Sequence, residues 1–111
     1  MTSLSTHVLD TAHGQPARGM KLSLWHDGAR LYDGATDDDG RCLGLGAGKS
    51  FAAGAYKLQF HVADYFRAQG VTLPDPPFLG LVSIDFGIAD DGHYHVPLLV
   101  SPFAYSTYRG S

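Results

Sequence analysis

Residues 20–35 read MKLSLWHDGARLYDGA, and this stretch indicates the fold class of the chain. Short runs in which apolar and polar residues alternate lie on both sides of His26-Asp27-Gly28, as expected of strands with one buried face. The Asp-Gly pair puts a glycine where a positive φ costs little, and an aspartate there can hydrogen-bond the local backbone. The stretch therefore predicts two strands, at residues 20–25 and 29–35, that are joined as a β-hairpin.

Similar short runs continue along the chain and are separated by clusters of Gly, Pro and Asp. Their spacing is typical of a β-sandwich. The Asp-Asp-Gly sequences at residues 38–40 and 90–92 repeat the signal of a hairpin turn. Besides the first hairpin, strands are predicted at residues 5–11, 55–62, 82–88, 93–101 and 104–108.

One segment has helical rather than strand spacing. Val62, Tyr65, Phe66 and Gln69 fall at positions i, i+3, i+4 and i+7, and Gly70 stands where a helix commonly ends. A single helix of about two turns is therefore expected at this place in the sandwich.

The composition describes one soluble globular domain that spans residues 1–111. The chain carries 8 Lys and Arg against 11 Asp and Glu, which gives a net charge of −3. This charge, without a basic run, argues against a nucleic-acid partner and against an anionic membrane surface. Cys42 is the only cysteine, so an internal disulfide and a multi-cysteine zinc site are excluded. Because the first residues also lack the pattern of a secretion signal, a cytoplasmic location is expected.

The segment 44–50 reads GLGAGKS and ends like a phosphate-binding loop. That motif needs its first glycine at position 43, which is occupied by Leu43, and no helical pattern follows Ser50. A flexible surface loop is therefore favoured over a nucleotide site.

The densest group of titratable residues is His93-Tyr94-His95, in a chain with 6 histidines. On a strand, residues i and i+2 share a face, so both imidazoles are expected to point the same way. That arrangement suits a metal ion or a proton-transfer site, but no spacing for the further ligands that zinc needs is recognisable. Two solvent-facing histidines, a metal site and acid–base chemistry all remain open. His7 and Arg41 are unremarkable singly, and spacing alone does not bring them to His95.

Three segments read together narrow these alternatives: STHVLDT at 5–11, TDDDGR at 36–41, and HYHVPLL at 93–99 with STYRGS at 106–111. Over essentially the whole chain they resemble the transthyretin-related 5-hydroxyisourate hydrolases. The ending Tyr-Arg-Gly-Ser is highly specific, and transthyretin itself, the carrier with this fold, lacks that tetrapeptide and the histidine pattern. The pair Phe103-Ala104 and the stretch 74–80 depart from the family pattern, but neither carries a site residue.

The resemblance implies an all-β, transthyretin-like (prealbumin-like) two-sheet sandwich of about eight strands with one short helix. It implies hydrolysis of 5-hydroxyisourate to 2-oxo-4-hydroxy-4-carboxy-5-ureidoimidazoline, by opening of a C–N amide bond, in purine catabolism. Neither a cofactor nor a metal ion is implied. The expected assembly is a homotetramer, a dimer of dimers whose central channel holds the active sites.

Site residues also follow from the resemblance. The implied catalytic positions are His7, Arg41, His95 and Ser111, and Tyr108, Arg109 and Gly110 join them in binding the substrate. Two imidazoles can activate a water and protonate the leaving nitrogen, and Arg41 or Arg109 can hold the developing negative charge. Ser111 is not expected to be a nucleophile, because no Ser-His-Asp arrangement is apparent. The carboxylate beside it can instead orient a histidine or a water.

Two other functions are compatible with the same fold. One is a transthyretin-like carrier that binds a small aromatic ligand in the tetramer channel. The other is a metal-binding sandwich built on His93 and His95. A carrier has no need of His7, Arg41, His95 and the C-terminal tetrapeptide at once, so the hydrolase is the leading prediction.

Overall fold

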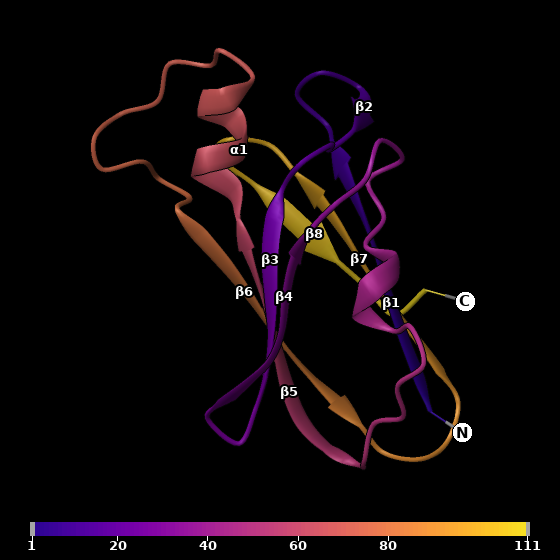
Figure 1. Cartoon of the computed structure of the whole chain (residues 1–111). Helices are drawn as coiled ribbons and strands as arrows, with labels where there is room; N and C mark the ends of the chain where they lie inside the picture. Colours follow the sequence, from indigo (N-terminus) through magenta and orange to yellow (C-terminus); the bar gives the residue numbers. More distant parts are fainter. Residues whose placement is uncertain (1, 111) are drawn as a thin grey trace.

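Two β-sheets packed face to face make up residues 2–110, the part of the chain that this computed structural model describes (Figure 1). One sheet has the strand order β2-β1-β7-β8 and the other has the order β4-β3-β5-β6. The elements, in chain order, are β1 (Ser3–Asp10), β2 (Gln15–Pro16), β3 (Lys21–His26), β4 (Ala29–Ala35), the 3-10 turn η1 (Leu43–Leu45), β5 (Gly54–His61), α1 (Val62–Ala68), β6 (Leu81–Ile88), β7 (His93–Val100) and β8 (Tyr105–Thr107). The predicted two-sheet sandwich is confirmed.

The hairpin predicted from residues 20–35 is present. β3 and β4 pair antiparallel, and the turn between them holds Asp27 at φ 51° and Gly28 at φ 77°. The two-residue strand β2 and the turn η1 were not predicted. The hairpin predictions at residues 38–40 and 90–92 are wrong. The first turn leads from β4 to the 3-10 turn η1 and not to a pairing strand, and the second connects β6 to β7, which belong to different sheets.

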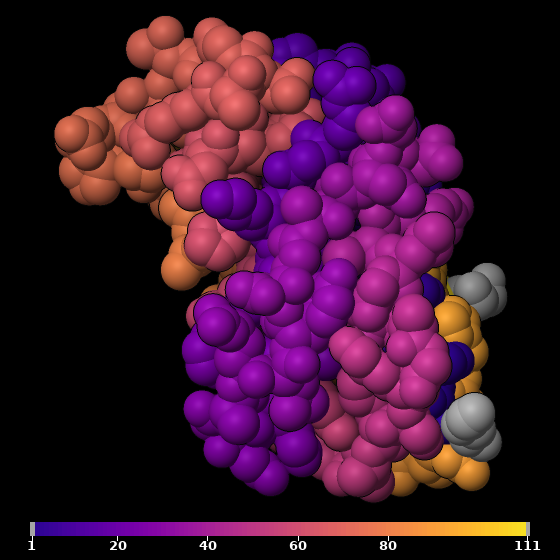
Figure 2. All heavy atoms as spheres, viewed as in Figure 1, coloured from indigo at the N-terminus to yellow at the C-terminus, as the bar shows by residue number. Residues whose placement is uncertain are grey.

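Helix α1 follows β5 without a break, and its predicted position is confirmed. It buries Tyr65 and Phe66, and the backbone N–H of Val71 closes the helix end by donating to the Phe66 carbonyl at 3.0 Å. The helix and the loop after it project beyond the sheets (Figure 1) and form the lobe at the upper left of Figure 2. No helix within residues 2–110 is long and apolar enough to cross a membrane.

The core lies between the sheets, and β1 contributes to it by strict alternation. Along β1, Leu4, Thr6 and Val8 are buried, while the residues between them are only partly buried. Each fully buried leucine in such a core contributes roughly 1.5–3 kcal/mol relative to an exposed one. The Thr6 hydroxyl, buried with them, donates a hydrogen bond to the Val96 carbonyl at 2.7 Å, so its burial leaves no unmet polar group. Alternation therefore sends every second side chain of β1 to the outer face of the sheet.

The segment that resembles a phosphate-binding loop has a structural role. Leu45 is fully buried, and Gly46 lies so close to β1 that an added Cβ would stand 2.2 Å from the Leu4 carbonyl oxygen. The interpretation of this segment as a flexible surface loop is therefore wrong for its first half. No helix begins between Ser50 and β5 in the described chain, so the backbone geometry of a phosphate-binding loop is absent there.

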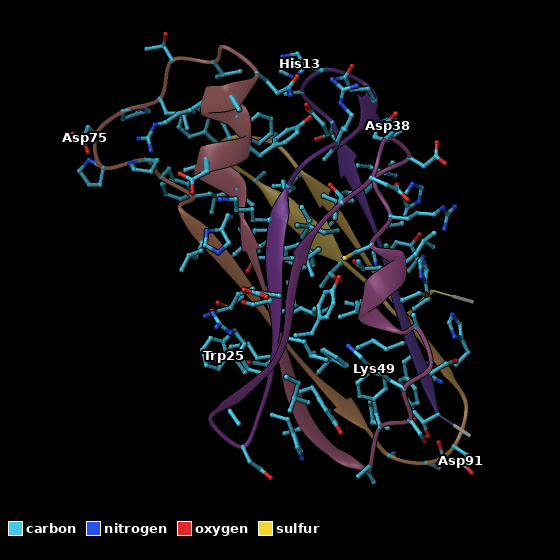
Figure 3. The ribbon with its side chains drawn as sticks, in the orientation of Figure 1. His13, Trp25, Asp38, Lys49, Asp75 and Asp91 are labelled. Atoms are coloured by element: carbon cyan, nitrogen blue, oxygen red, sulfur yellow. The ribbon has the colours of Figure 1, made fainter. Side chains whose placement is uncertain are left out.

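A buried carboxylate ties β1 to the helix. One oxygen of Asp10 accepts hydrogen bonds from His13 Nδ1 at 2.6 Å and from the Tyr65 hydroxyl at 2.8 Å, and the other accepts from the His13 backbone N–H at 3.0 Å. Figure 3 shows His13 at the end of the molecule that carries α1. Burial raises the pKa of the Asp10 carboxyl, but the hydrogen bonds from His13 and Tyr65 outweigh it and leave the pKa below its ordinary value.

The lowered pKa of Asp10 predicts acid-sensitive stability. A carboxyl whose pKa is lower in the folded state stabilises the fold above its unfolded pKa, and this stabilisation is lost as the pH falls through the folded pKa. Asp10→Asn is expected to remove roughly 1.5–3 kcal/mol of unfolding free energy at pH 7 and to flatten the decline between pH 5 and 2. Urea unfolding at several pH values measures both effects, with the exposed Asp85→Asn as the matched control. Equal pH dependence in the Asp10 variant and the wild type would contradict this assignment.

Candidate active site

The candidate site lies on the outer face of the sheet that contains β1 and β7. These strands pair in parallel, with Ser3 opposite His93 and Ser5 opposite His95. The two imidazoles point the same way, as predicted, with ring centroids 6.4 Å apart and planes 14° from parallel. The residues opposite them on β1 are Ser3 and Ser5, whose hydroxyl groups make this face of the sheet polar.

His95 is the most constrained imidazole of this face. Its Nδ1 lies 2.7 Å from the Ser5 hydroxyl, and its backbone carbonyl accepts a hydrogen bond from the Gly110 N–H at 2.8 Å. Burial lowers the pKa of His95, and repulsion from the protonated form of His93, from Arg41 and from the protonated form of His7 lowers it further. The imidazole is therefore neutral near pH 7, which is the state that can accept a proton.

Arg41 reaches this face through a tight turn. Asp37 caps the turn, since its side-chain Oδ1 accepts the Arg41 N–H at 3.0 Å and its carbonyl accepts the Gly40 N–H at 3.0 Å. Gly40 has φ 77° and lies against β1, where an added Cβ would stand 2.3 Å from the Val8 carbonyl oxygen. The turn thereby places Arg41 in an isolated antiparallel bridge with His7.

His7 has a defined protonation pattern. Its Nε2 lies 2.8 Å from the Asp39 carbonyl oxygen. A carbonyl oxygen can only accept, so Nε2 carries the proton and Nδ1 of the neutral ring is left as an acceptor. The same turn that brings Arg41 to the site therefore also orients His7.

The tail after β8 divides between the two faces of the sheet. Gly110 forms an isolated antiparallel bridge with His95 on the outer face. The Arg109 guanidinium instead lies 4.1 Å from the ring centroid of the buried Tyr94 and donates to the His93 carbonyl at 3.3 Å. Arg109 therefore lies on the face of the sheet that is turned toward the other sheet, at the edge of the sandwich. Tyr108 is exposed. Ser111 lies outside the described residues.

The structure thus gathers His7, Arg41, His95 and the Gly110 backbone on one surface. Arg109, the other arginine considered for the developing charge, lies on the opposite side of the sheet from His95. Residues 2–110 contain no group of three or more His, Cys, Asp or Glu side chains placed to hold a metal ion. Ser5 was missed as a site residue. A signal for it was present, since it stands two residues before His7 on a strand and therefore shares its face.

The site is an open sheet surface rather than a cavity. A hollow of about 820 Å³ lies on the other sheet and is lined by residues such as Trp25, Lys57 and Asp85. No member of the histidine and arginine group lines it. A substrate on the outer face of β1 and β7 would therefore need a further wall to exclude water.

Fold and site together define a class: a two-sheet β-sandwich whose one sheet carries three imidazoles and a guanidinium on its outer face. Sequence comparison places this protein within that class. The chain belongs to the HIUase/Transthyretin family, whose sequence model matches residues 4–110. The resemblance drawn from its motifs is confirmed.

Individual relatives agree with this assignment. The chain is 58% identical over 114 residues to 5-hydroxyisourate hydrolase 2 of Rhizobium meliloti, and the match covers 97% of this chain and 95% of the relative. The structure of Klebsiella pneumoniae 5-hydroxyisourate hydrolase superposes with a TM-score of 0.88 at 36% identity and covers 100% of both chains. Sea bream transthyretin in complex with thyroxine gives a TM-score of 0.84 at 31% identity, covering 97% of this chain and 94% of that one. The predicted transthyretin-like fold is therefore confirmed.

Proposed function

We propose that this chain is a hydrolase that converts 5-hydroxyisourate to 2-oxo-4-hydroxy-4-carboxy-5-ureidoimidazoline. The observation that carries the proposal is the meeting of His7, Arg41 and His95 on one surface, in a chain 58% identical to a named 5-hydroxyisourate hydrolase. Residues 1–111 act as one domain, and the reaction uses no cofactor and no metal ion. This conversion is a step of urate degradation.

The base in this proposal is His95. Its Nδ1 is engaged by Ser5, so Nε2 is the nitrogen available to a water molecule. The neutral ring takes a proton from that water, which attacks the ring carbonyl carbon of the substrate. The resulting imidazolium then donates the proton to the leaving nitrogen as the C–N bond breaks.

Arg41 and His7 act on the substrate rather than on the water. Arg41 holds the negative charge that develops on the carbonyl oxygen, through charge-assisted hydrogen bonds. Its charge already reaches His95, whose pKa it lowers. His7 has a free acceptor at Nδ1 and orients an N–H of the substrate. Tyr108, Gly110 and Ser111 complete the substrate site, with Ser111 and its carboxylate in an orienting role. Arg109 supports the site from the other face of the sheet, where its guanidinium donates to the His93 carbonyl.

A homotetramer, arranged as a dimer of dimers, supplies the missing wall of this site. Among residues 2–110, β6 and β8 end their sheets with unpaired edges that can accept a strand from a neighbouring chain. Phe103, Tyr105 and Tyr108 are exposed, and large exposed aromatic side chains commonly mark interfaces. Enclosing the outer face between dimers would exclude bulk water and strengthen the charged contacts.

The proposed surroundings of the enzyme follow from its composition. Cys42 is a buried free thiol, which supports a cytoplasmic location. The net charge of −3 supports a small molecule as substrate, with neither nucleic acid nor a membrane as partner.

The decay of freshly generated 5-hydroxyisourate, followed by absorbance, tests the function. Micromolar protein treated with a chelator is expected to accelerate the decay as strongly as untreated protein does. Acceleration that the chelator abolishes would favour the metal-binding sandwich instead. No acceleration, from protein shown to be folded and tetrameric by sedimentation, would favour a carrier of a small aromatic ligand, as the likeness to thyroxine-bound sea bream transthyretin allows.

A further inference from the structure

A continuous chain of hydrogen bonds runs along the outer face of β1 and β7. Ser3 Oγ lies 2.6 Å from His93 Nδ1, Ser5 Oγ lies 3.0 Å from His93 Nε2, and the same Ser5 Oγ lies 2.7 Å from His95 Nδ1. The parallel register of the strands produces it, because Ser3 stands opposite His93 and Ser5 opposite His95. Each serine hydroxyl is thereby placed beside an imidazole, and the Ser5 hydroxyl touches both rings.

The hydrogens of this hydrogen-bond chain can be arranged in two orders of donors and acceptors. The Ser5 hydroxyl has one hydrogen, so it donates to one ring and accepts from the other. In the first order, His95 Nδ1–H donates to Ser5, Ser5 donates to His93 Nε2, and His93 Nδ1–H donates to Ser3. In the second order every donor and acceptor is exchanged. The two neutral imidazoles must therefore adopt the same tautomer, and Ser5 is the group that couples them.

Only the first order suits the proposed reaction. It leaves Nε2 of His95 with a free lone pair, which is needed to take a proton from water. The second order puts a hydrogen on that nitrogen and removes the base. The tautomer of a catalytic imidazole is thus set by the partner of its other nitrogen.

We propose that Ser5 is a positioning residue that, together with His93, holds His95 in the tautomer with its hydrogen on Nδ1. This inference rests on the proposed hydrolase function, which selects the first order. The coupling of the two tautomers through Ser5 follows from the hydrogen bonds alone. The charged and titratable groups that face His95 are His93 from its own strand, His7 from β1 and Arg41 from the turn after β4.

Ser5→Ala is the variant that tests this role. We expect kcat to fall about 10- to 100-fold, as when the group that orients a metal-bound imidazole is removed, and KM to change by less than about threefold. Ser5→Thr keeps the hydroxyl and is expected to restore most of the rate. Ser83→Ala, on a strand of the other sheet, is the matched control and should leave kcat and thermal stability unchanged.

The tautomers are measured directly by nitrogen-15 NMR of the imidazole rings. In the wild type, His93 and His95 are both expected to carry the hydrogen on Nδ1 at pH 8, and in Ser5→Ala the His95 ring should become a mixture of tautomers. Opposite tautomers on the two rings of the wild type would overturn the proposal, even if the alanine variant failed to fold. Wild-type kcat in a folded Ser5→Ala would also overturn it, as would a threonine variant as slow as the alanine variant. If the wild type does not hydrolyse 5-hydroxyisourate, the proposed function fails while the NMR result still decides the positioning role.

Discussion

Replacing His95 with alanine is expected to lower kcat for 5-hydroxyisourate hydrolysis by about 10²- to 10⁴-fold, the range that general acid–base groups contribute. The imidazole is half-buried and its pKa is lowered by burial and by neighbouring positive charge, so it is the neutral ring poised to accept a proton. In the wild type, kcat/KM should fall as the pH drops below the lowered pKa of His95, because the protonated ring is no base. In the variant this acid limb should disappear. Stopped-flow absorbance between pH 5 and 9 measures both effects.

The matched control for this substitution is His61→Ala. His61 ends β5 on the other sheet, where its Nδ1 lies 3.7 Å from an oxygen of the exposed Asp64. Its loss should leave kcat unchanged. A loss of less than threefold in His95→Ala, in protein of wild-type thermal stability, would mean that His95 does not transfer the proton.

The second large effect is expected from a single methyl group. A Cβ added at Gly110 would stand 2.5 Å from His95 Cδ2 and 3.2 Å from Cγ, so Gly110→Ala forces the imidazole to move. Such a shift would break the 2.7 Å contact between Nδ1 and Ser5. Misplacement of a catalytic group by about 1 Å can cost about 10² in rate, and we expect a loss of that order in kcat.

Gly80→Ala is a suitable control for the methyl group. An added Cβ there meets no heavy atom within 4 Å, and the residue has no positive φ. Both variants should fold, since Gly110 lies at the partly buried outer surface. Wild-type kcat in Gly110→Ala would show that the tail does not hold the His95 ring in its working position.

Local features of this fold were readable from the sequence because they depend on neighbouring residues. The alternation and the Asp-Gly turn of residues 20–35 lie within one hairpin, and the helical spacing that begins at Val62 extends over two turns of neighbouring residues. The shared face of His93 and His95 follows from the period of a strand. Only the ends of these elements differ, by one or two residues.

Features that depend on distant pairing were not readable from spacing. β1 lies in parallel beside β7, and periodicity does not specify which strands become neighbours. For this reason the meeting of His7 with Arg41 and His95 entered only through the family resemblance. Ser5 was overlooked because its contact with His95 exists only once the two strands are aligned.

The direction of Arg109 shows a different limit. The motif Tyr-Arg-Gly-Ser suggested that all its members face the substrate. Gly110 pairs with His95, and side chains of an extended chain alternate, so Arg109 is directed to the other side of the sheet, onto Tyr94. A motif of consecutive residues on an extended segment cannot present every side chain to one face.

The parallel pairing of β1 with β7 has a consequence for how the protein acquires activity. Ser5 and His95 are 90 residues apart in the chain, so their contact closes a loop of nearly the full length. Closing so long a loop costs chain entropy before any contact offsets it, and folds rich in such contacts form slowly. The β3–β4 hairpin can form from its own residues, whereas the site exists only after both ends of the chain have met. During synthesis on the ribosome, the active site can therefore form only after β7 has emerged and has paired with β1.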